Sequence, residues 1–289
     1  MPSERYERPS PATTAPQTGT ETLPWLDRPD ALQAIDARVR AGSLAADDAG
    51  WLRKWVRDGY VAFDGVVPDD LITAINRDTG AVVAEFGHLP RGELIPKFQN
   101  LFVQSAATRR AMRLPAILDK LRLLIGREPV PYQTLNLPVS SQQGAHSDAI
   151  LMTTRPHGFM AAAWLALEDV KPDAGPLKLY TGSHRLPYVG PEEVGIPRGV
   201  SSAAASAAFD AKYYAHIDGI VRARGLQPVP FLGRRGSIVI WHYNLLHGAF
   251  LQDRPDATRK SLIIHYFFEG ADAFSDLWEW PAVIPSLAD

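Results

Sequence analysis

The chain has 289 residues, of which 46% are hydrophobic and 21% are charged, and its formal net charge is −2. This is the composition of a globular protein, and a chain of this length can bury about 75% of its unfolded surface without covalent cross-links. A near-neutral chain without a basic tract argues against nucleic acid or an anionic membrane as a partner. The absence of cysteine excludes disulfides, thiolate metal sites and cysteine nucleophiles.

Hydropathy gives no sign of a membrane or secretory segment. The first residues contain no apolar run of the kind found in a signal peptide. The longest apolar run, residues 159–167, has nine residues and is too short to span a bilayer. We therefore expect a cytoplasmic protein.

The N-terminal part of the chain is predicted to be helical after a short tail. Residues 1–22 are rich in Pro, Ser, Thr, Ala and Glu, which favours a disordered tail, and residues 23–289 are expected to form one domain. Apolar residues at helical spacing predict helices, and one β-rich run predicts a strand at 60–63. The predicted helices cover 30–41, the segment from Ser43 through Trp55, 68–86 and 108–126.

The sequence pattern changes near residue 131, where short apolar runs begin to alternate with turns rich in Gly, Pro and Asp. This pattern is typical of a sandwich or barrel, so we predict a helical part at 23–130 followed by a β core at 131–270. The predicted strands are 134–139, 149–154, 159–170, 177–180, 237–242 and 261–268. The Ala-rich segment 201–224 predicts a helix or lid within an insertion at about 186–230.

The pair His146-x-Asp148 is the first part of a candidate metal site. In an extended strand, side chains at positions i and i+2 leave the same face, so the imidazole and the carboxylate would point side by side. Small residues at 140–145 precede the pair and leave room for bound groups. A random His-x-Asp is more often structural, so the site needs a third ligand from elsewhere.

His247 is the preferred third ligand, because it lies beyond the end of the strand predicted at 237–242 and precedes Gly248. His242 is a rival, but inside an apolar strand it is more readily a packed residue, and His184 in a loop is a weaker rival. The surface is the expected place for His88, His157 and His216.

Two His and one carboxylate form the facial triad of non-haem Fe(II) oxygenases, which leaves three coordination positions open. Zinc is compatible with the same ligand types. Asp148 favours hydroxylation over halogenation, because a halogenating site needs the carboxylate position vacated for halide.

Arg259 is a candidate anchor for an anionic co-substrate. It opens the strand predicted at the end of the β core, and by period two it shares a face with Ser261, Ile263 and His265. An inward-facing Arg needs an anionic partner, which a dicarboxylate held in a bidentate fork would provide. The alternative is an Arg at an exposed strand start, with its head group in water.

A set of ordered motifs resembles the phytanoyl-CoA dioxygenase family of Fe(II)/2-oxoglutarate-dependent oxygenases. Their order and spacing agree with the family over about residues 55–270. The motifs are His146-x-Asp148, residues 163–170, residues 173–177, residues 182–185, Trp241-x5-His247-Gly248 and Arg259–Ser261.

The resemblance implies a mainly β fold, the double-stranded β-helix or jelly roll, with the N-terminal helices packed on one sheet. It further implies that Fe(II) is the metal and that 2-oxoglutarate and O2 are co-substrates. The implied Fe(II) ligands are His146, Asp148 and His247, and Arg259 would bind the far carboxylate of 2-oxoglutarate.

The resemblance also assigns less specific roles around the co-substrate. Trp164 is placed near it on an inward strand face, and Gln133 and Asn136 are placed as its hydrogen-bond partners. Family members often carry a Ser two residues after the distal His. This chain has Ala249 there, and Thr258 is the alternative donor.

The expected function is therefore a 2-oxoglutarate-dependent dioxygenase that hydroxylates a small molecule and releases succinate and CO2. The main alternative is a metal-dependent hydrolase or isomerase on a cupin-like barrel, although a water-activating site needs no dicarboxylate anchor. A binding protein with an inert barrel is the third possibility, which the intact triad disfavours. The candidates for contacting an anionic substrate are Arg91, Lys97, Arg155 and Arg185.

Overall fold

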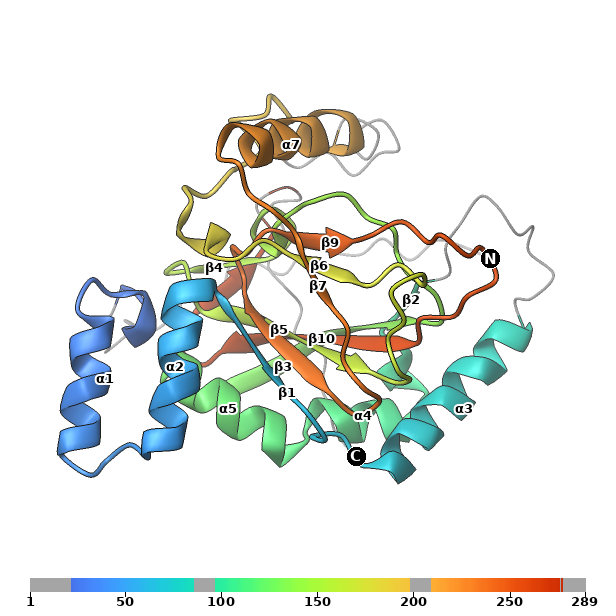
Figure 1. Ribbon diagram of the computed structural model, residues 1–289, viewed down its shortest axis with the longest axis horizontal. Helices are drawn as coiled ribbons and strands as arrows, with labels where there is room; N and C mark the ends of the chain where they lie inside the picture. The colour runs from blue at the N-terminus through green and yellow to red at the C-terminus, as the bar shows by residue number, and fades with distance from the viewer. Residues whose placement is uncertain (1–21, 86–96, 198–208, 276, 278–289) are drawn as a thin grey trace, which may run out of the picture.

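The computed structural model describes residues 22–85, 97–197, 209–275 and 277. Two antiparallel sheets face each other, and helices cover the outer side of the larger one (Figure 1). This arrangement is the predicted mainly β fold with N-terminal helices. The predicted tail at 1–22 lies almost entirely outside the described residues.

The larger sheet has six strands in the order β1-β8-β5-β10-β3-β2, and all neighbours pair antiparallel. The strands are β1 Tyr60–Phe63, β8 Ile238–His242, β5 Met160–Ala166, β10 Ser261–Phe268, β3 Pro129–Leu137 and β2 Phe98–Gln99. Both edges come from the N-terminal part: β1 is the strand predicted at 60–63, whereas β2 was not predicted.

The smaller sheet has three strands in the order β7-β6-β9. They are β7 Val229–Phe231, β6 Leu177–Leu179 and β9 His247–Ala249. Two further strands, β4 Thr153–Arg155 and β11 Asp272–Phe274, form a separate antiparallel pair.

Figure 1 shows α3, α4 and α5 beneath the six-stranded sheet and α7 on the opposite side, beyond the smaller sheet. The α-helices are α1 Ala31–Arg40, α2 Ala46–Asp58, α3 Asp69–Glu85, α4 Ala106–Met112, α5 Pro115–Ile125 and α7 Tyr214–Ala223. The short helices are η1 Trp25–Asp27, η2 Leu101–Val103, η3 Asp148–Ile150, η4 Ser183–Arg185 and the π-helix η5 Phe209–Tyr213. The first eight residues of the predicted lid, 201–208, lie outside the described part of the chain.

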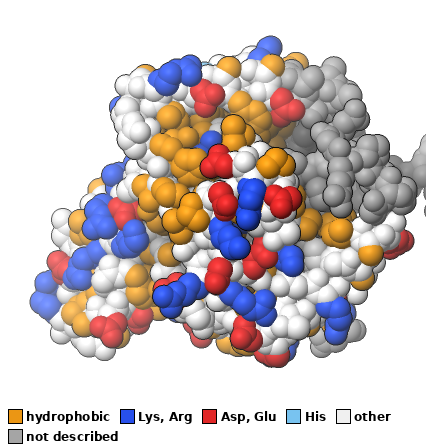
Figure 2. Space-filling view, turned by 45° about the vertical axis from the view of Figure 1, so that its right-hand side comes forward, with side chains coloured by type: hydrophobic (Ala, Val, Ile, Leu, Met, Phe, Trp, Pro, Cys, Tyr) orange, Lys and Arg blue, Asp and Glu red, His pale blue; other side chains and the backbone are white. Residues whose placement is uncertain are grey.

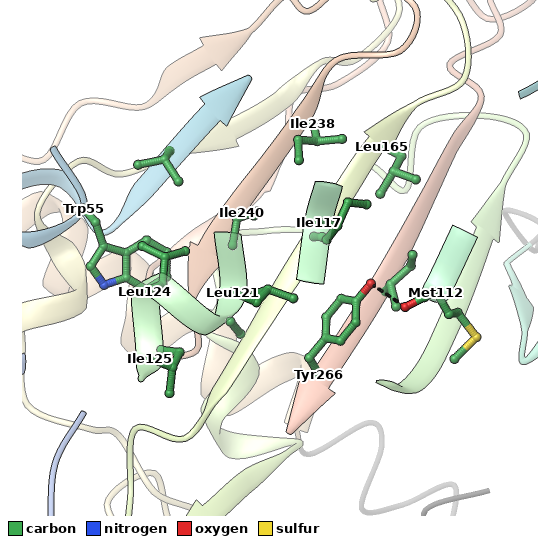
Figure 3. Close-up of a cluster of buried hydrophobic side chains, with 14 of the residues drawn as sticks. Trp55, Met112, Ile117, Leu121, Leu124, Ile125, Leu165, Ile238, Ile240 and Tyr266 are labelled. Atoms are coloured by element: carbon green, nitrogen blue, oxygen red, sulfur yellow. Dashed lines mark hydrogen bonds between the residues drawn. The ribbon is translucent and has the colours of Figure 1, made fainter. Parts of the chain in front are cut away.

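Residues of the central strands alternate between two hydrophobic clusters. Leu165, Ile240 and Tyr266 pack with the helices, whereas Trp164 and Trp241 face the smaller sheet. Figure 3 shows the helix side, where the hydroxyl of Tyr266 donates to the carbonyl of Met112 at 3.2 Å. The face of the larger sheet that is turned toward the smaller sheet, called the inner face below, therefore carries Trp164 and Trp241. The candidate site lies on this side, among polar side chains.

The helix predicted at 108–126 is two helices, α4 and α5. Pro115 is the first residue of α5, and Leu114 before it is extended, with φ −63° and ψ 115°. Proline lacks an N–H and disfavours helical geometry in the residue before it, so it starts a new helix instead of continuing the old one.

None of the helices in the described ranges is long and apolar enough to cross a membrane. On the face drawn in Figure 2, basic and acidic side chains are interspersed over the surface, in keeping with the net charge of −2.

Candidate metal centre

His146 and His247 are brought together by backbone pairing. The N–H of His146 donates to the carbonyl of His247 at 2.9 Å, and the N–H of His247 donates back at 2.8 Å. This is an antiparallel bridge that extends the smaller sheet beyond β9. Residues directly opposite in such a bridge place their side chains on the same face, and the two ring centroids lie 4.5 Å apart.

Asp148 joins the two imidazoles because the backbone between it and His146 is extended. Ser147 has φ −107° and ψ 151°, so the i and i+2 side chains share a side as predicted. The strand predicted from 149 is wrong at its start, since η3 begins at Asp148 and β4 only at Thr153. Ligand atoms of His146, Asp148 and His247 lie within 4.8 Å of one another, and all three residues are buried.

Both imidazoles are oriented by their Nδ1 atoms. Nδ1 of His146 lies 2.9 Å from the carbonyl of Gly144, and Nδ1 of His247 lies 3.0 Å from that of Leu245. A carbonyl accepts only from a protonated nitrogen, so these contacts fix the proton on Nδ1. Each Nε2 is then left with a lone pair for a metal, which is the usual arrangement of ligating histidines.

The electrostatics of the centre favour the protonation states that bind a metal. Burial lowers the pKa of His146 to about 3, and the neighbouring His247 adds to the effect, so the imidazole is neutral near pH 7. Burial alone would raise the pKa of Asp148, but the imidazoles of His247 and His265 outweigh it and hold that pKa below its ordinary value. The centre thus offers the neutral imidazole of His146 beside the ionised carboxylate of Asp148.

The rival histidines lie elsewhere. His242 points to the opposite side of β8 from Trp241, where its Nε2 lies 3.1 Å from a carboxylate oxygen of Asp27 and its ring packs on Trp55. The ring of His184 contacts that of His242, with centroids 5.3 Å apart. The structure therefore brings His247, and neither rival, to the His146–Asp148 pair.

Arg259 is 2% exposed and lies on the inner side of the barrel, with its guanidinium 5.4 Å from the centroid of Trp164. Within the described residues, its Nε and Nη1 have no hydrogen-bond partner, and neither do Trp164 Nε1 and Ser261 Oγ. Burial lowers the pKa of Arg259 to about 10, an effect that the carboxylate of Glu168 partly offsets. Two of these three side chains are donors only and the third is a hydroxyl, so the cluster fits a carboxylate.

The chain matches the phytanoyl-CoA dioxygenase (PhyH) family model over residues 55–255, which is more than half of its length. It belongs to the phytanoyl-CoA dioxygenase family. The expectation from the ordered motifs is confirmed. No curated protein matches the chain.

Solved structures similar to this phytanoyl-CoA dioxygenase family member share its fold at low sequence identity. The non-heme alpha ketoglutarate dependent carbocyclase SnoK from nogalamycin biosynthesis is 17% identical, with a TM-score of 0.61 over 85% of this chain and 95% of SnoK. EctD from S. alaskensis in its apoform is 20% identical, with a TM-score of 0.60 over 84% of this chain and 85% of EctD. The nogalamycin epimerase SnoN is 20% identical, with a TM-score of 0.55 over 85% and 86% of the two chains.

Not every residue that the family resemblance assigned to the co-substrate lies at the site. Gln133 pairs with His265 across β3 and β10 and shares the inner face. Asn136 pairs with Leu262 on the other face, where its side chain donates to Thr79 of α3 at 3.1 Å. The assignment of Asn136 is therefore wrong, because a strand presents residues three apart to opposite faces.

The hydroxyl near Arg259 is also different from the expected one. Thr258 is exposed and donates to a carboxylate oxygen of Glu168 at 3.0 Å, so it is already engaged. Ser261, two residues after Arg259, is fully buried, and its hydroxyl has no partner among the described residues. Within the described part of the chain, Ser261 therefore has a free hydroxyl on the inner face, whereas Ala249 has none.

Two residues at the centre were not assigned a role from the sequence. Trp241 Nε1 donates to Asp148 Oδ2 at 2.8 Å, and His265 Nε2 lies 3.7 Å from the same oxygen. The period-two pattern did place His265 on the face of Arg259. Trp241 belongs to the family motif that ends at His247, but its contact with Asp148 depends on the pairing of β8 with β5.

The basic residues considered for an anionic substrate have different surroundings. Arg185 donates to the carbonyls of Val56 and Arg57, and Arg155 stacks on Phe274 at 4.4 Å. Lys97 is exposed as a residue, but surrounding protein atoms partly desolvate its ammonium and lower its pKa, an effect that Asp210 opposes and Arg259 adds to. Arg91 lies outside the described residues.

Gly248, which follows His247, is required by the close approach of the ligand segment. A Cβ at this position would lie 2.6 Å from the carbonyl oxygen of Gly144 and 2.7 Å from that of Gln143. Gly248→Ala is therefore expected to displace the backbone before His146, to cost about 1–3 kcal/mol of stability, and to weaken metal binding. Urea denaturation with and without Mn(II) measures both effects.

Gly219 in α7 is the matched control, since a Cβ there meets nothing within 4 Å. Gly219→Ala is expected to stabilise the protein by about 0.5–1 kcal/mol, because alanine is the better helix former. A Gly248→Ala protein as stable and as responsive to Mn(II) as the Gly219→Ala protein would contradict the role of Gly248.

Proposed function

We propose that this protein is a non-haem Fe(II)- and 2-oxoglutarate-dependent dioxygenase that hydroxylates a small molecule. The observation that carries the proposal is Arg259, which is buried on the inner side of the barrel that also holds the His146–Asp148–His247 cluster. Its Nε and Nη1 have no hydrogen-bond partner among the described residues. A metal-dependent hydrolase has no use for a buried, unpaired guanidinium, whereas a dicarboxylate co-substrate satisfies it.

The donor set fits Fe(II). Two imidazoles and one carboxylate provide three ligands on one side, which leaves the other positions to a co-substrate that binds through its own oxygens. When bound, Fe(II) supplies the activation of O2. The residues of the chain hold the ligand atoms, orient the co-substrate and exclude water, since His146, Asp148 and His247 are only 4–6% exposed.

The far carboxylate of 2-oxoglutarate is proposed to accept from Arg259 and from the hydroxyl of Ser261. The indole N–H of Trp164 is the third free donor on this face. Gln133 is retained as a contact of the co-substrate because it lies on the inner face beside His265. These contacts would fix the co-substrate with one end at the arginine and the other at the metal ligands.

The proposed reaction balances with O2 as the oxidant. One oxygen atom enters a C–H bond of the substrate to give an alcohol. The other enters 2-oxoglutarate, which loses CO2 and leaves as succinate. Support for this class comes from a structural neighbour described with 2-oxoglutarate and 5-hydroxyectoine, EctD from S. alaskensis, which has a TM-score of 0.57 and 19% identity.

The fold is compatible with more than one outcome of the oxidation, because structures that share it include a carbocyclase and an epimerase. Hydroxylation is favoured over halogenation by the carboxylate of Asp148. A hydroxylated product is one oxygen atom heavier than the substrate, a cyclised product is two hydrogen atoms lighter, and an epimer has the same mass. Mass spectrometry with isotopically labelled O2 identifies a hydroxylated or a cyclised product, and chromatography separates an epimer from the unreacted substrate.

The decisive experiment adds Fe(II) and 2-oxoglutarate to the protein without oxygen and then admits O2. We expect a weak visible charge-transfer band in the first step and succinate in the second, released faster when a substrate from a small-molecule panel is present. Absence of both the band and succinate would reject the dioxygenase. A hydrolase would instead turn over with zinc under anaerobic conditions.

A further inference from the structure

The carboxylate of Asp148 is held asymmetrically. Its Oδ1 lies 3.6 Å from His247 Nε2, on the side of the other two ligands. Its Oδ2 accepts the indole N–H of Trp241 at 2.8 Å and lies 3.7 Å from His265 Nε2. The two oxygens therefore have different neighbours before any metal arrives.

Trp241 contacts two of the three ligand side chains. It is fully buried in β8, where it pairs with Ala162 of β5 on one side and Tyr60 of β1 on the other. Its ring lies 4.5 Å from that of His247, while its N–H reaches Asp148. An indole N–H is a donor only, so it cannot replace a ligand, and its hydrogen bond to an ionised carboxylate is of the stronger, charge-assisted kind.

The number of carboxylate oxygens on the metal decides how many positions remain for co-substrates. A carboxylate can bind a metal through one oxygen or through both. A facial triad leaves three open positions only when each of its residues supplies one atom. A second oxygen from Asp148 would fill one of the three, which 2-oxoglutarate and O2 together require.

We propose that Trp241 is a positioning residue that engages Oδ2 of Asp148, so that the carboxylate offers the metal one oxygen. Its ring at the same time fixes the plane of His247 from the side. This inference rests on the proposed function for the identity of the co-substrates, but its geometry concerns only the metal ligands. Neighbours of a metal ligand typically change metal affinity by about 10–100-fold when they are removed.

Trp241→Phe tests the proposal, because it keeps a ring against His247 and removes the N–H. Trp55→Phe is the matched control: Trp55 is also fully buried, and its Nε1 has no partner among the described residues. The probe is Co(II), titrated without 2-oxoglutarate, because its visible bands change with the identity and arrangement of the atoms that coordinate it. A second titration with 2-oxoglutarate follows at saturating Co(II).

We expect Trp241→Phe to change the affinity for Co(II) by about 10–100-fold, to alter its visible spectrum, and to weaken 2-oxoglutarate binding, because the second oxygen of Asp148 then competes for a position that the co-substrate needs. Trp55→Phe is expected to lower only the melting temperature. A Trp241→Phe protein with the wild-type Co(II) affinity and spectrum would overturn the proposal. Failure of the wild type to bind Co(II) or 2-oxoglutarate would instead count against the proposed function.

A measurement on the wild type covers the case in which Trp241→Phe does not fold. The indole N–H resonance of Trp241, assigned among the seven tryptophans, is expected at low field and protected from exchange. In Asp148→Ala the resonance should move upfield. An unshifted resonance would show that the N–H does not bond to the carboxylate and would overturn the inference.

Discussion

Replacing His247 with alanine is expected to lower 2-oxoglutarate turnover by on the order of 10³-fold or more, because even an outer partner of a metal ligand is worth about 10–100-fold. The imidazole of His247 packs against that of His146 and is fixed by the carbonyl of Leu245. Its loss leaves two ligands, and the protein should no longer gain thermal stability from Mn(II). Succinate release and melting temperature with and without Mn(II) measure the two effects.

The matched control is His242→Ala, which removes a buried histidine five positions earlier in the chain. His242 contacts Asp27 and Trp55 on the helix side of the six-stranded sheet. The control should therefore melt at a lower temperature yet keep the full gain in stability from Mn(II). The opposite pattern, in which His242→Ala abolishes the Mn(II) effect and His247→Ala preserves it, would refute the choice of the third ligand.

The placement of His146 beside Asp148 could be predicted from the sequence because the geometry of this pair is local. One extended residue, Ser147, is enough to place His146 and Asp148 on the same side, and the sequence pattern predicts an extended backbone there. His247 was predicted from its place after an apolar strand. Its actual position at the start of β9, bridged to His146, is a long-range pairing that no local pattern specifies.

The two-residue period of a strand explains why some residues were predicted correctly to lie on the inner face and why Asn136 was not. Arg259, Ser261 and His265 were placed on one face by period two, and the structure keeps Ser261 and His265 on the inner face. Gln133 and Asn136 were proposed together although residues three apart in a strand face opposite ways. The sequence alone already contained the reason to reject one of them.

The hydrogen bond between Trp241 and Asp148 could not be predicted from sequence patterns. It joins β8 to the first residue of η3, and the two residues are 93 positions apart in the chain. Nothing in the local sequence of either residue distinguishes a packed tryptophan from one that donates to a ligand. Only the register of β8 against β5, Trp241 opposite Ala162, places that indole beside the carboxylate.

Replacing Arg259 with methionine is expected to have opposite effects on the stability of the free protein and on co-substrate binding. In the free protein Nε and Nη1 of Arg259 are buried with no hydrogen-bond partner in the part of the chain that the structure describes, and an unsatisfied buried donor costs about 1–3 kcal/mol, more when charged. Methionine keeps the apolar stem without the charge, so Arg259→Met should raise the free energy of unfolding by about 1–3 kcal/mol.

The same substitution removes the charge-assisted hydrogen bonds to the far carboxylate of 2-oxoglutarate. A hydrogen bond to a charged group contributes about 1.5–3 kcal/mol, so a fork of two bonds is worth about 3 kcal/mol or more, at least about 10²-fold in affinity. The KM for 2-oxoglutarate should rise by that factor, and 2-oxoglutarate should no longer raise the melting temperature in the presence of Mn(II).

Arg109→Met provides a control of the opposite sign. Arg109 donates to the carbonyls of Phe102 and Val103 at 2.6 and 3.2 Å, so its loss should lower stability and leave the KM for 2-oxoglutarate unchanged. If Arg259→Met behaved like this control, Arg259 would be a structural residue of the barrel. If the partner of Arg259 is the co-substrate, Arg259→Met should be more stable than the wild type and should no longer respond to 2-oxoglutarate. The reason is that a bound ligand offsets the cost of burying the guanidinium donors, and the free protein bears that cost.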